Sequence, residues 1–279
     1  MNRLKSVFIS TWITLLFVGS GRALWQLATD ARATEWYWVL LALLPGALFF
    51  VWLLVADVAR TAHATRVVVV LSLVALAGLM LTGGDAAEPW FWTGLVGAGG
   101  SGLYEWWYSR FGERSSALLV VGEKLPPLAF ERPDGTLLET DALGKPMLMI
   151  FYRGNWCPLC MAQVKEIAGQ YRELADRGVE IMLISPQPHA ETASLAKRFD
   201  APMTFLVDAA NRMAEKLGIK AQAGLPVGLE ALGYDSDTVM PTVVITDASG
   251  VILFADLTDN YRVRPEPDVF LEVFSRAGI

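Results

Sequence analysis

The sequence predicts two structural units, an all-α bundle of about four transmembrane helices followed by an α/β domain. Three observations predict this organisation. The chain has 279 residues, which exceeds the commonest size of a single domain. Hydrophobic residues make up 53% of it, and all but one of its ten tryptophans precede residue 110. From about residue 115, short β-like runs alternate with amphipathic segments, which is typical of an α/β domain.

Four apolar stretches before residue 110 each approach the ~20 residues that a helix needs to cross a bilayer. They are residues 7–27, 36–56, 67–82 and 89–108. A cleaved signal peptide is the alternative for the first stretch, because Arg3 and Lys5 precede a short apolar core. We therefore expect a transmembrane domain over residues 1–109, a linker over 110–121 and a second domain over 122–279.

The fourth stretch is polar in part, since it contains Glu105 and a glycine-rich run. Tryptophans bracket it at both ends, as aromatic belts bracket a membrane span. Glu105 has two interpretations, an intramembrane acid with a function, or a group that faces Arg22 or lies at the interface.

The distribution of basic residues predicts the orientation of the bundle. With four spans and an N-terminus inside, the inside basic residues outnumber the outside ones. The inside set is Arg3, Lys5, Arg60, Arg66, Arg110 and Arg114, and the outside set is Arg22 and Arg32. We expect an integral protein of the plasma (inner) membrane, in contact with the lipid bilayer, whose second domain is cytoplasmic; a periplasmic or other extracytoplasmic domain is the alternative.

The elements of the second domain follow from apolar runs and turn residues. A continuous apolar run at residues 147–152 predicts a central strand, and helical spacing predicts a helix from the two cysteines to Gly178. Further strands are expected at 179–184 and 203–207, with a helix at 190–199 between them. Residues 242–246 and 251–255 flank an Asp–Ala–Ser–Gly turn and predict a hairpin, and residues 268–277 a last helix.

The two cysteines of the chain, Cys157 and Cys160, lie three residues apart at this strand-to-helix junction. On the first turn of a helix such a pair can reach disulfide geometry with little movement. Unpaired N–H groups there favour a thiolate, so Cys157 is expected as the nucleophile and Cys160 as the resolving thiol. Pro158 suits the first helical position, and Arg153 and Trp156 add positive charge and a hydrophobic lip.

Other interpretations of the pair are open, and some are excluded. Two inert buried cysteines, or half of a zinc site, are possible by composition. A c-type haem attachment would need histidine after the pair, where Met161 stands. The net charge of −6 excludes a basic stripe, so no nucleic-acid partner is expected.

The run Phe–Tyr–Arg–Gly–Asn–Trp–Cys–Pro–Leu–Cys at residues 151–160 resembles the active-site segment of redoxins. These form the alkyl hydroperoxide reductase and thiol-specific antioxidant (peroxiredoxin-like) group of the thioredoxin-like superfamily. The resemblance covers about residues 118–279 and implies a mixed central sheet flanked by helices. Met240, Pro241 and Thr242 are similar to the segment that carries the cis-proline of this superfamily, so the resemblance implies a cis bond before Pro241, against the dithiol.

The sequence departs from the peroxiredoxin pattern at two activating positions. Cys157 stands where peroxiredoxins have a threonine, so Cys160 aligns with their peroxidatic cysteine, and Pro241 stands where they have an arginine. Arg153 could substitute in part, and Arg262 and Arg264 are further candidates, although solvated or structural arginines are commoner.

These observations predict a membrane-anchored thiol–disulfide oxidoreductase with the redox-active pair Cys157 and Cys160 and without a bound cofactor or metal. The alternative is a thiol peroxidase that reduces hydroperoxides. A non-catalytic metal carrier or thiol sensor is a third hypothesis. The expected partner is a redox protein, offering a thiol or a disulfide, or a peroxide. Residues 224–237 are either a lid or docking surface beside the site or a plain surface insertion.

Overall fold

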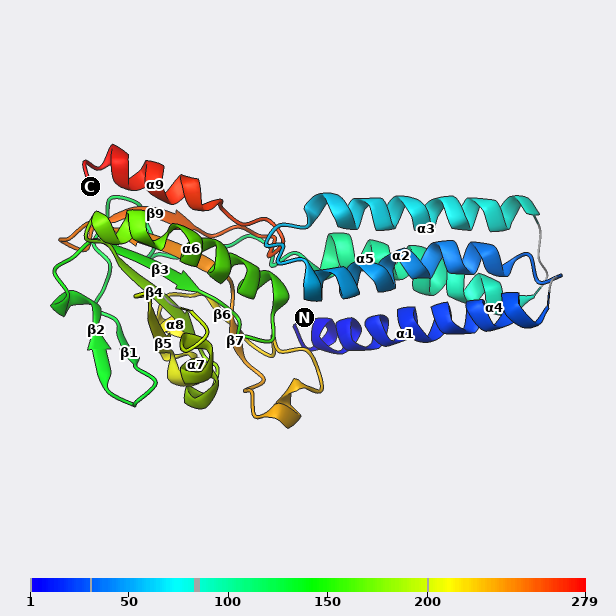
Figure 1. The fold of residues 1–279 in the computed structure, drawn as a ribbon, viewed down its shortest axis with the longest axis horizontal. Helices are drawn as coiled ribbons and strands as arrows, with labels where there is room; N and C mark the ends of the chain where they lie inside the picture. The colour runs from blue at the N-terminus through cyan, green and yellow to red at the C-terminus, as the bar shows by residue number, and fades with distance from the viewer. Residues whose placement is uncertain (1, 31, 83–85, 200) are drawn as a thin grey trace. The chain divides into compact units, whose positions relative to one another are not determined.

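The computed structural model describes residues 2–30, 32–82, 86–199 and 201–279. These residues divide into two compact units, the first mainly 3–56 and 60–111 and the second mainly 112–279 (Figure 1). We describe each unit by itself.

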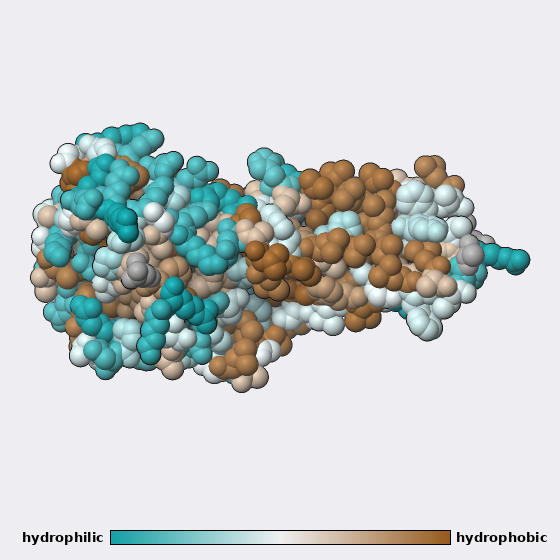
Figure 2. Space-filling view, in the orientation of Figure 1, coloured by the Kyte–Doolittle hydropathy of each residue, from teal (hydrophilic) through white to brown (hydrophobic). Residues whose placement is uncertain are grey.

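Helices make up the first unit, and among its described residues three helices are long and apolar enough to cross a membrane. These are α1 (Asn2–Thr29), α2 (Trp36–Val55) and α3 (Ala62–Thr82). Side chains such as Leu54, Val55 and Leu81 are more than two thirds exposed. Exposed apolar side chains on long helices are typical of a surface that contacts lipid or another protein. Hydrophobic residues dominate the face of these helices that is visible in Figure 2.

The fourth predicted span is helical from Ala87 to Tyr108, but it alternates between α and π geometry. It consists of α4 (Ala87–Trp90), a π-helix (Phe91–Gly99), α5 (Gly100–Leu103) and a second π-helix (Tyr104–Tyr108). The wide turns of a π-helix displace main-chain carbonyls from their usual partners. One of these carbonyls, on Val96, accepts a hydrogen bond of 2.9 Å from Trp12 Nε1. Whether this helix crosses a membrane stays a prediction.

Glu105 does not pair with Arg22. Thr65 Oγ1 donates to Glu105 Oε2 at 2.7 Å, and Arg66 Nε lies 3.8 Å from Glu105 Oε1. Arg22 instead binds Glu88 through two hydrogen bonds of 3.0 and 3.2 Å. The carboxylate of Glu105 is therefore held inside the bundle by neighbours on α3.

The second unit is built on a mixed sheet of seven strands in the order β2-β1-β5-β4-β3-β8-β9. β3 pairs with β4 and β4 with β5 in parallel, whereas the other neighbours are antiparallel. A separate two-stranded sheet joins β6 to β7. The strands are β1 (Ala129–Glu131), β2 (Leu137–Glu139), β3 (Met147–Phe151), β4 (Glu180–Ser185), β5 (Thr204–Val207), β6 (Lys220–Ala221), β7 (Thr238–Val239), β8 (Thr242–Thr246) and β9 (Ile252–Asp256).

The helices of this unit are α6 (Pro158–Asp176), α7 (His189–Ala196), α8 (Arg212–Lys216) and α9 (Pro267–Arg276). β3 is buried along its whole length, as its continuous apolar sequence predicts. Its residues Met147, Met149 and Phe151 enter a core cluster that also holds Ala214 of α8. The mixed sheet with helices is the thioredoxin-like fold that the sequence predicted, and the strand, hairpin and terminal-helix predictions hold to within a few residues.

Candidate active site

The active-site loop, residues 152–157, connects the end of β3 to the start of α6. Gly154 adopts a φ of +151°, and a Cβ at this position would lie 2.5 Å from Trp156 Nε1, so the loop requires glycine there. Cys157 has an extended conformation just before the helix, and Pro158 opens the helix as expected. Cys160 lies on the first turn, which brings its sulfur to 2.6 Å from the sulfur of Cys157.

Both cysteines are free thiols and are buried. Burial raises the pKa of Cys157 well above its usual value, because the charged form loses water, and the neighbouring Cys160 adds to the rise. Burial alone would also raise the pKa of Cys160. The hydrogen bond between the two sulfurs, the guanidinium of Arg264 and the main-chain N–H of Arg153 outweigh it and lower this pKa to about 5.

Position on the helix favours a thiolate at Cys157, but the unpaired N–H groups of the first turn are close to both residues. The charges of Arg264 and Arg153 favour the thiolate form of both cysteines. The contact of Arg264 Nη2 with Cys160 Sγ favours Cys160 as the nucleophile, whereas position along the helix favours Cys157.

Arg264, from the segment between β9 and α9, supplies that charge. Its Nη2 donates to Cys160 Sγ at 3.4 Å, its Nη1 to Gln163 Oε1 at 2.6 Å and its Nε to the Tyr261 carbonyl at 3.1 Å. Burial would lower the pKa of Arg264, but the charges of Cys160 and Cys157 raise it. Arg264 is thus a buried cation in direct contact with the sulfur of Cys160.

Arg153 supports the loop more than it supports the sulfur. Its guanidinium donates to the Gly224 carbonyl and lies 4.8 Å from the centre of the Trp156 ring. Its carbonyl accepts a hydrogen bond of 2.9 Å from Thr238 Oγ1. The guanidinium of Arg153 and the ring of Trp156, which were predicted to border the thiols, are therefore stacked on each other.

A polar network holds the loop from its other side. Asn155 N donates to Gln187 Oε1 at 2.8 Å, and Gln187 Nε2 donates to the Tyr152 hydroxyl at 3.2 Å. The Asn155 side chain donates to Glu191 Oε2 at 2.7 Å and accepts from the Tyr234 hydroxyl at 2.5 Å. Residues 224–238, α7 and the residues just before α7 thus contact the active-site loop. Residues 224–237 therefore lie beside the site, as one of their two interpretations predicted, and a role as a lid stays a prediction.

Thr242, the first residue of β8, pairs with Phe151, the last residue of β3. Met240 and Pro241 therefore lie at the end of the sheet where the active-site loop begins. The predicted cis bond before Pro241 is wrong, because the described residues include no cis peptide. The Met240 carbonyl accepts from Thr242 Oγ1 at 2.8 Å, and the Pro241 carbonyl accepts from Arg114 Nη1 at 2.9 Å.

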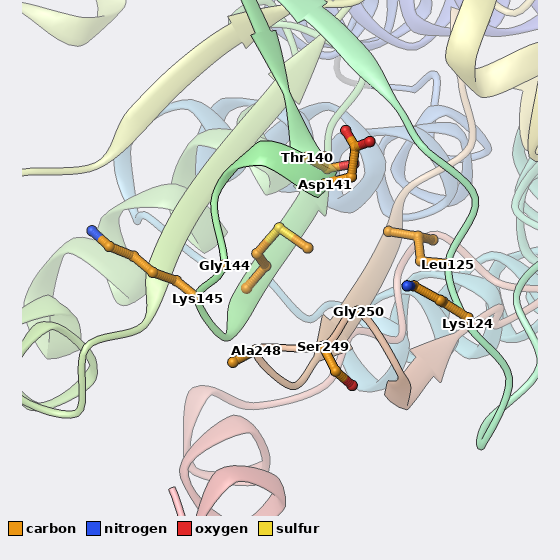
Figure 3. A pocket seen from close by; sticks show the side chains of 10 residues that line it. Lys124, Leu125, Thr140, Asp141, Gly144, Lys145, Ala248, Ser249 and Gly250 are labelled. Atoms are coloured by element: carbon orange, nitrogen blue, oxygen red, sulfur yellow. The ribbon is translucent and has the colours of Figure 1, made fainter.

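A small hollow of about 60 Å³ lies at the amino end of β3, whereas the cysteines follow the carboxyl end of this strand. Figure 3 shows that this hollow is bordered by the β8–β9 turn and the loop before β3. It is lined by Lys124, Leu125, Thr140, Asp141, Gly144, Lys145, Met147, Ala248, Ser249 and Gly250. No cysteine borders it. Within the described ranges, no group of three or more His, Cys, Asp or Glu side chains could hold a metal ion.

The mixed sheet and the helix that begins at a buried dithiol are features of the thioredoxin-like fold. Comparison with known proteins finds a family match in this unit. Residues 121–255 match the model of the AhpC/TSA family.

The relatives are peroxiredoxins. The chain is 25% identical over 129 residues to the chloroplastic peroxiredoxin Q of Sedum lineare, covering 46% of this chain and 69% of that protein. It is 26% identical over 135 residues to the putative peroxiredoxin bcp of Coxiella burnetii, covering 48% and 85%. The chain spans about half of the peroxiredoxin Q of Populus jackii, at 27% identity over 101 residues, 36% of this chain and 47% of that protein.

Among solved structures, the peroxidoxin BcpB of Mycobacterium tuberculosis is similar, with a TM-score of 0.44 and 18% identity. That likeness covers 57% of this chain and 97% of the other. The family match and the relatives support a thiol-dependent oxidoreductase. They support the peroxidase alternative better than disulfide exchange.

Proposed function

We propose that this chain is a membrane-anchored thiol peroxidase in which Cys160 is the peroxidatic thiol and Cys157 the resolving thiol. The contact of 3.4 Å between Arg264 Nη2 and Cys160 Sγ carries the proposal. It supplies a positive charge at the sulfur although the family's arginine position is occupied by Pro241.

The chemistry follows from the reactive form of each thiol. The Cys160 thiolate attacks the terminal oxygen of a hydroperoxide, so that an S–O bond forms and the O–O bond breaks. The leaving alkoxide or hydroxide takes a proton and departs as alcohol or water. The negative charge that moves onto this oxygen in the transition state is stabilised by a guanidinium in a site of low dielectric.

Resolution uses the neighbouring thiol. Cys157 sulfur attacks the sulfenic sulfur of Cys160, water leaves and a disulfide forms within one helical turn. A thiol reductant then returns two electrons to the pair. The high pKa of Cys157 suits this order, because a neutral thiol does not compete for the peroxide.

The test is the reaction of the reduced full-length chain, in detergent micelles, with hydrogen peroxide. We expect a rate far above that of an ordinary thiol in the wild type and in Cys157→Ser, and an ordinary rate in Cys160→Ser. Mass spectrometry should find a trapped sulfenic acid on Cys160 in Cys157→Ser and a disulfide in the wild type. Ordinary rates in all three proteins would contradict the proposal.

Disulfide exchange stays a second candidate, favoured by the placement of two adjacent thiols on one turn of α6. It differs from the first in its oxidant. Rapid reduction of a protein disulfide by the wild type, together with an ordinary rate with peroxide, would support it.

We also propose that the redoxin domain lies on the cytoplasmic side, with a cytoplasmic thiol protein as its reductant. The bias of Lys and Arg in the loops supports this side. Because both native cysteines are buried, the test uses reporters in a chain that lacks them. We expect an impermeant maleimide to label Thr34→Cys in intact cells and not Ala248→Cys, since both positions are exposed in the structure. Labelling of Ala248→Cys alone would reverse the orientation.

A further inference from the structure

Arg114 joins two segments that leave the sheet at the active-site edge. Its Nη1 donates to the carbonyls of Pro241 and Thr258, at 2.9 and 2.8 Å, and its Nη2 donates to Thr242 Oγ1 at 2.6 Å. One guanidinium therefore fixes the start of β8 relative to the chain that follows β9. Arginine suits such a site, because its planar fork can bind several oxygens at once.

The charge of Arg114 is kept in spite of burial. Burial lowers its pKa to about 10, and the carboxylate of Asp256 opposes this fall. Burial raises the pKa of Asp256, which the charges of both Arg114 and Arg264 counteract. The charges of Arg114 and Arg264 therefore both favour the ionised form of Asp256, at the end of β9.

The chain segment from Thr258 to Arg264 connects the contact of Arg114 with the sulfur of Cys160. Thr258 lies six residues before Arg264, and the chain between them turns at Asn260, whose side-chain oxygen accepts from Arg262 N at 3.1 Å. The Tyr261 carbonyl at the end of this turn accepts from Arg264 Nε. Fixing the carbonyl of Thr258 therefore limits where the Arg264 guanidinium can lie.

We propose that Arg114 is a positioning residue, which holds residues 258–264 so that the Arg264 guanidinium stays against Cys160 Sγ. Both arginines lie outside the family match at residues 121–255. The cation that the family carries at the position of Pro241 is thus supplied by Arg264, from a segment that follows the family match. This inference rests on the proposed function only where peroxide is the readout, because ionisation of Cys160 can be measured without it.

The experiment uses full-length Arg114→Gln in detergent micelles. Ionisation of Cys160 is followed with pH by the ultraviolet absorbance of the thiolate, taken as the difference from Cys160→Ser. We expect the midpoint of the Arg114→Gln titration to rise by about one pH unit, since part of the stabilisation by a nearby opposite charge is lost. Where the midpoint rises far enough to leave part of the thiol protonated at neutral pH, the peroxide rate should fall in proportion to the ionised fraction.

Graded variants separate positioning from general stability. Arg114→Lys keeps the charge without the fork and should lie between Arg114→Gln and the wild type. Thr242→Val removes one of the three acceptors and should give a smaller rise in the same direction. Arg132→Gln, at an exposed arginine of the β1–β2 turn, is the matched control and should keep the wild-type midpoint.

A wild-type midpoint in Arg114→Gln, accompanied only by a lower melting temperature, would overturn the proposal and make Arg114 a structural residue. If Arg114→Gln fails to fold, a wild-type midpoint in Thr242→Val would overturn the proposal in the same way. A raised midpoint in a chain whose wild type reacts slowly with peroxide would support the positioning role and sink the peroxidase.

Discussion

The two units use buried polar groups in different ways. In the helical unit they pair within the bundle, as Trp12 Nε1 does with the Val96 carbonyl and Ser72 Oγ with the Ala42 carbonyl at 3.1 Å. In the redoxin unit two of them, the Arg264 guanidinium and the Cys157 thiol, contact one reactive atom, the sulfur of Cys160. The comparison teaches that burial of polar groups indicates chemistry where their contacts leave one reactive atom ionised, and architecture where they only complete hydrogen bonds.

Acidification is the strongest way to test this contrast, because it removes the charge itself. The pKa of Cys160 is lowered to about 5, so its thiol is ionised at neutral pH and becomes protonated as the pH falls through that value. We expect the peroxide rate to be flat from neutral pH down to about 6 and to fall about tenfold per pH unit below 5.

The same titration contributes to folding stability with a defined sign. The unfolded chain has an ordinary thiol pKa of about 8.5, so ionised Cys160 stabilises the fold above that pH, and this contribution is lost as the pH falls through about 5. The control is denatured protein, whose alkylation profile should have its midpoint near 8.5. A midpoint near 8.5 in the folded protein would remove the contrast between the two units.

Arg264→Gln should have the next largest effect, because it removes the cation at Cys160 and leaves a neutral side chain of similar reach. We expect the peroxide rate at neutral pH to fall by about 10- to 100-fold, through a higher thiol pKa and a less stabilised transition state. Raising the pH should recover the part that is due to ionisation. Arg276→Gln, which loses only an exposed ion pair with Glu272, is the matched control and should keep the wild-type rate. An unchanged rate in Arg264→Gln would contradict the proposal that Arg264 activates the thiol of Cys160.

The contacts of Arg264 also mark the limit of prediction from sequence. The spans follow from length and hydropathy, and the reactive segment follows from a buried strand that ends in glycine and a Cys–Pro–x–Cys helix start. Arg264 reaches Cys160 across 104 residues of chain, and no spacing rule connects them. Gln163, one helical turn after Cys160, was a usable signal, since it places a polar acceptor on the same buried face of α6.

Short elements escaped prediction for a different reason. β1 and β2 have three residues each and α8 has five, which is too few for a period of two or of 3.6 to be visible. Helix position does not choose the nucleophile because it bears on both thiols, whereas the contact of Arg264 with Cys160 comes from elsewhere in the fold.

Gly100→Ala tests the architectural side of the comparison. A Cβ at Gly100 would lie 2.1 Å from Trp12 Nε1, and the Trp12 ring is held by its hydrogen bond to Val96. Overpacking of this kind costs about 1–3 kcal/mol, which thermal unfolding in micelles should show. The midpoint of the Cys160 titration should not move.

Gly21→Ala is the matched control in the same unit, because no atom of the described residues lies within 4 Å of its added Cβ. Alanine is the better helix former, so this variant should be neutral or more stable by up to about 1 kcal/mol. A shift of the Cys160 midpoint in Gly100→Ala, but not in Gly21→Ala, would contradict the separation of roles between the units.

Tyr234→Phe should have the smallest effect, and it tests whether residues 224–237 act as a lid. The variant removes the hydroxyl that donates to Asn155 Oδ1 and should cost about 0.5–1.5 kcal/mol locally, because one hydrogen bond to the active-site loop is lost. We expect faster hydrogen exchange in residues 224–237 and a few-fold faster reduction of the Cys157–Cys160 disulfide by a small thiol. The Cys160 midpoint should stay, because Tyr234 touches the loop and not the sulfur. Tyr171→Phe, on the surface of α6, is the control. Unchanged disulfide reduction with faster exchange would make the segment a plain insertion, since loosening it would then not open the path to the thiols.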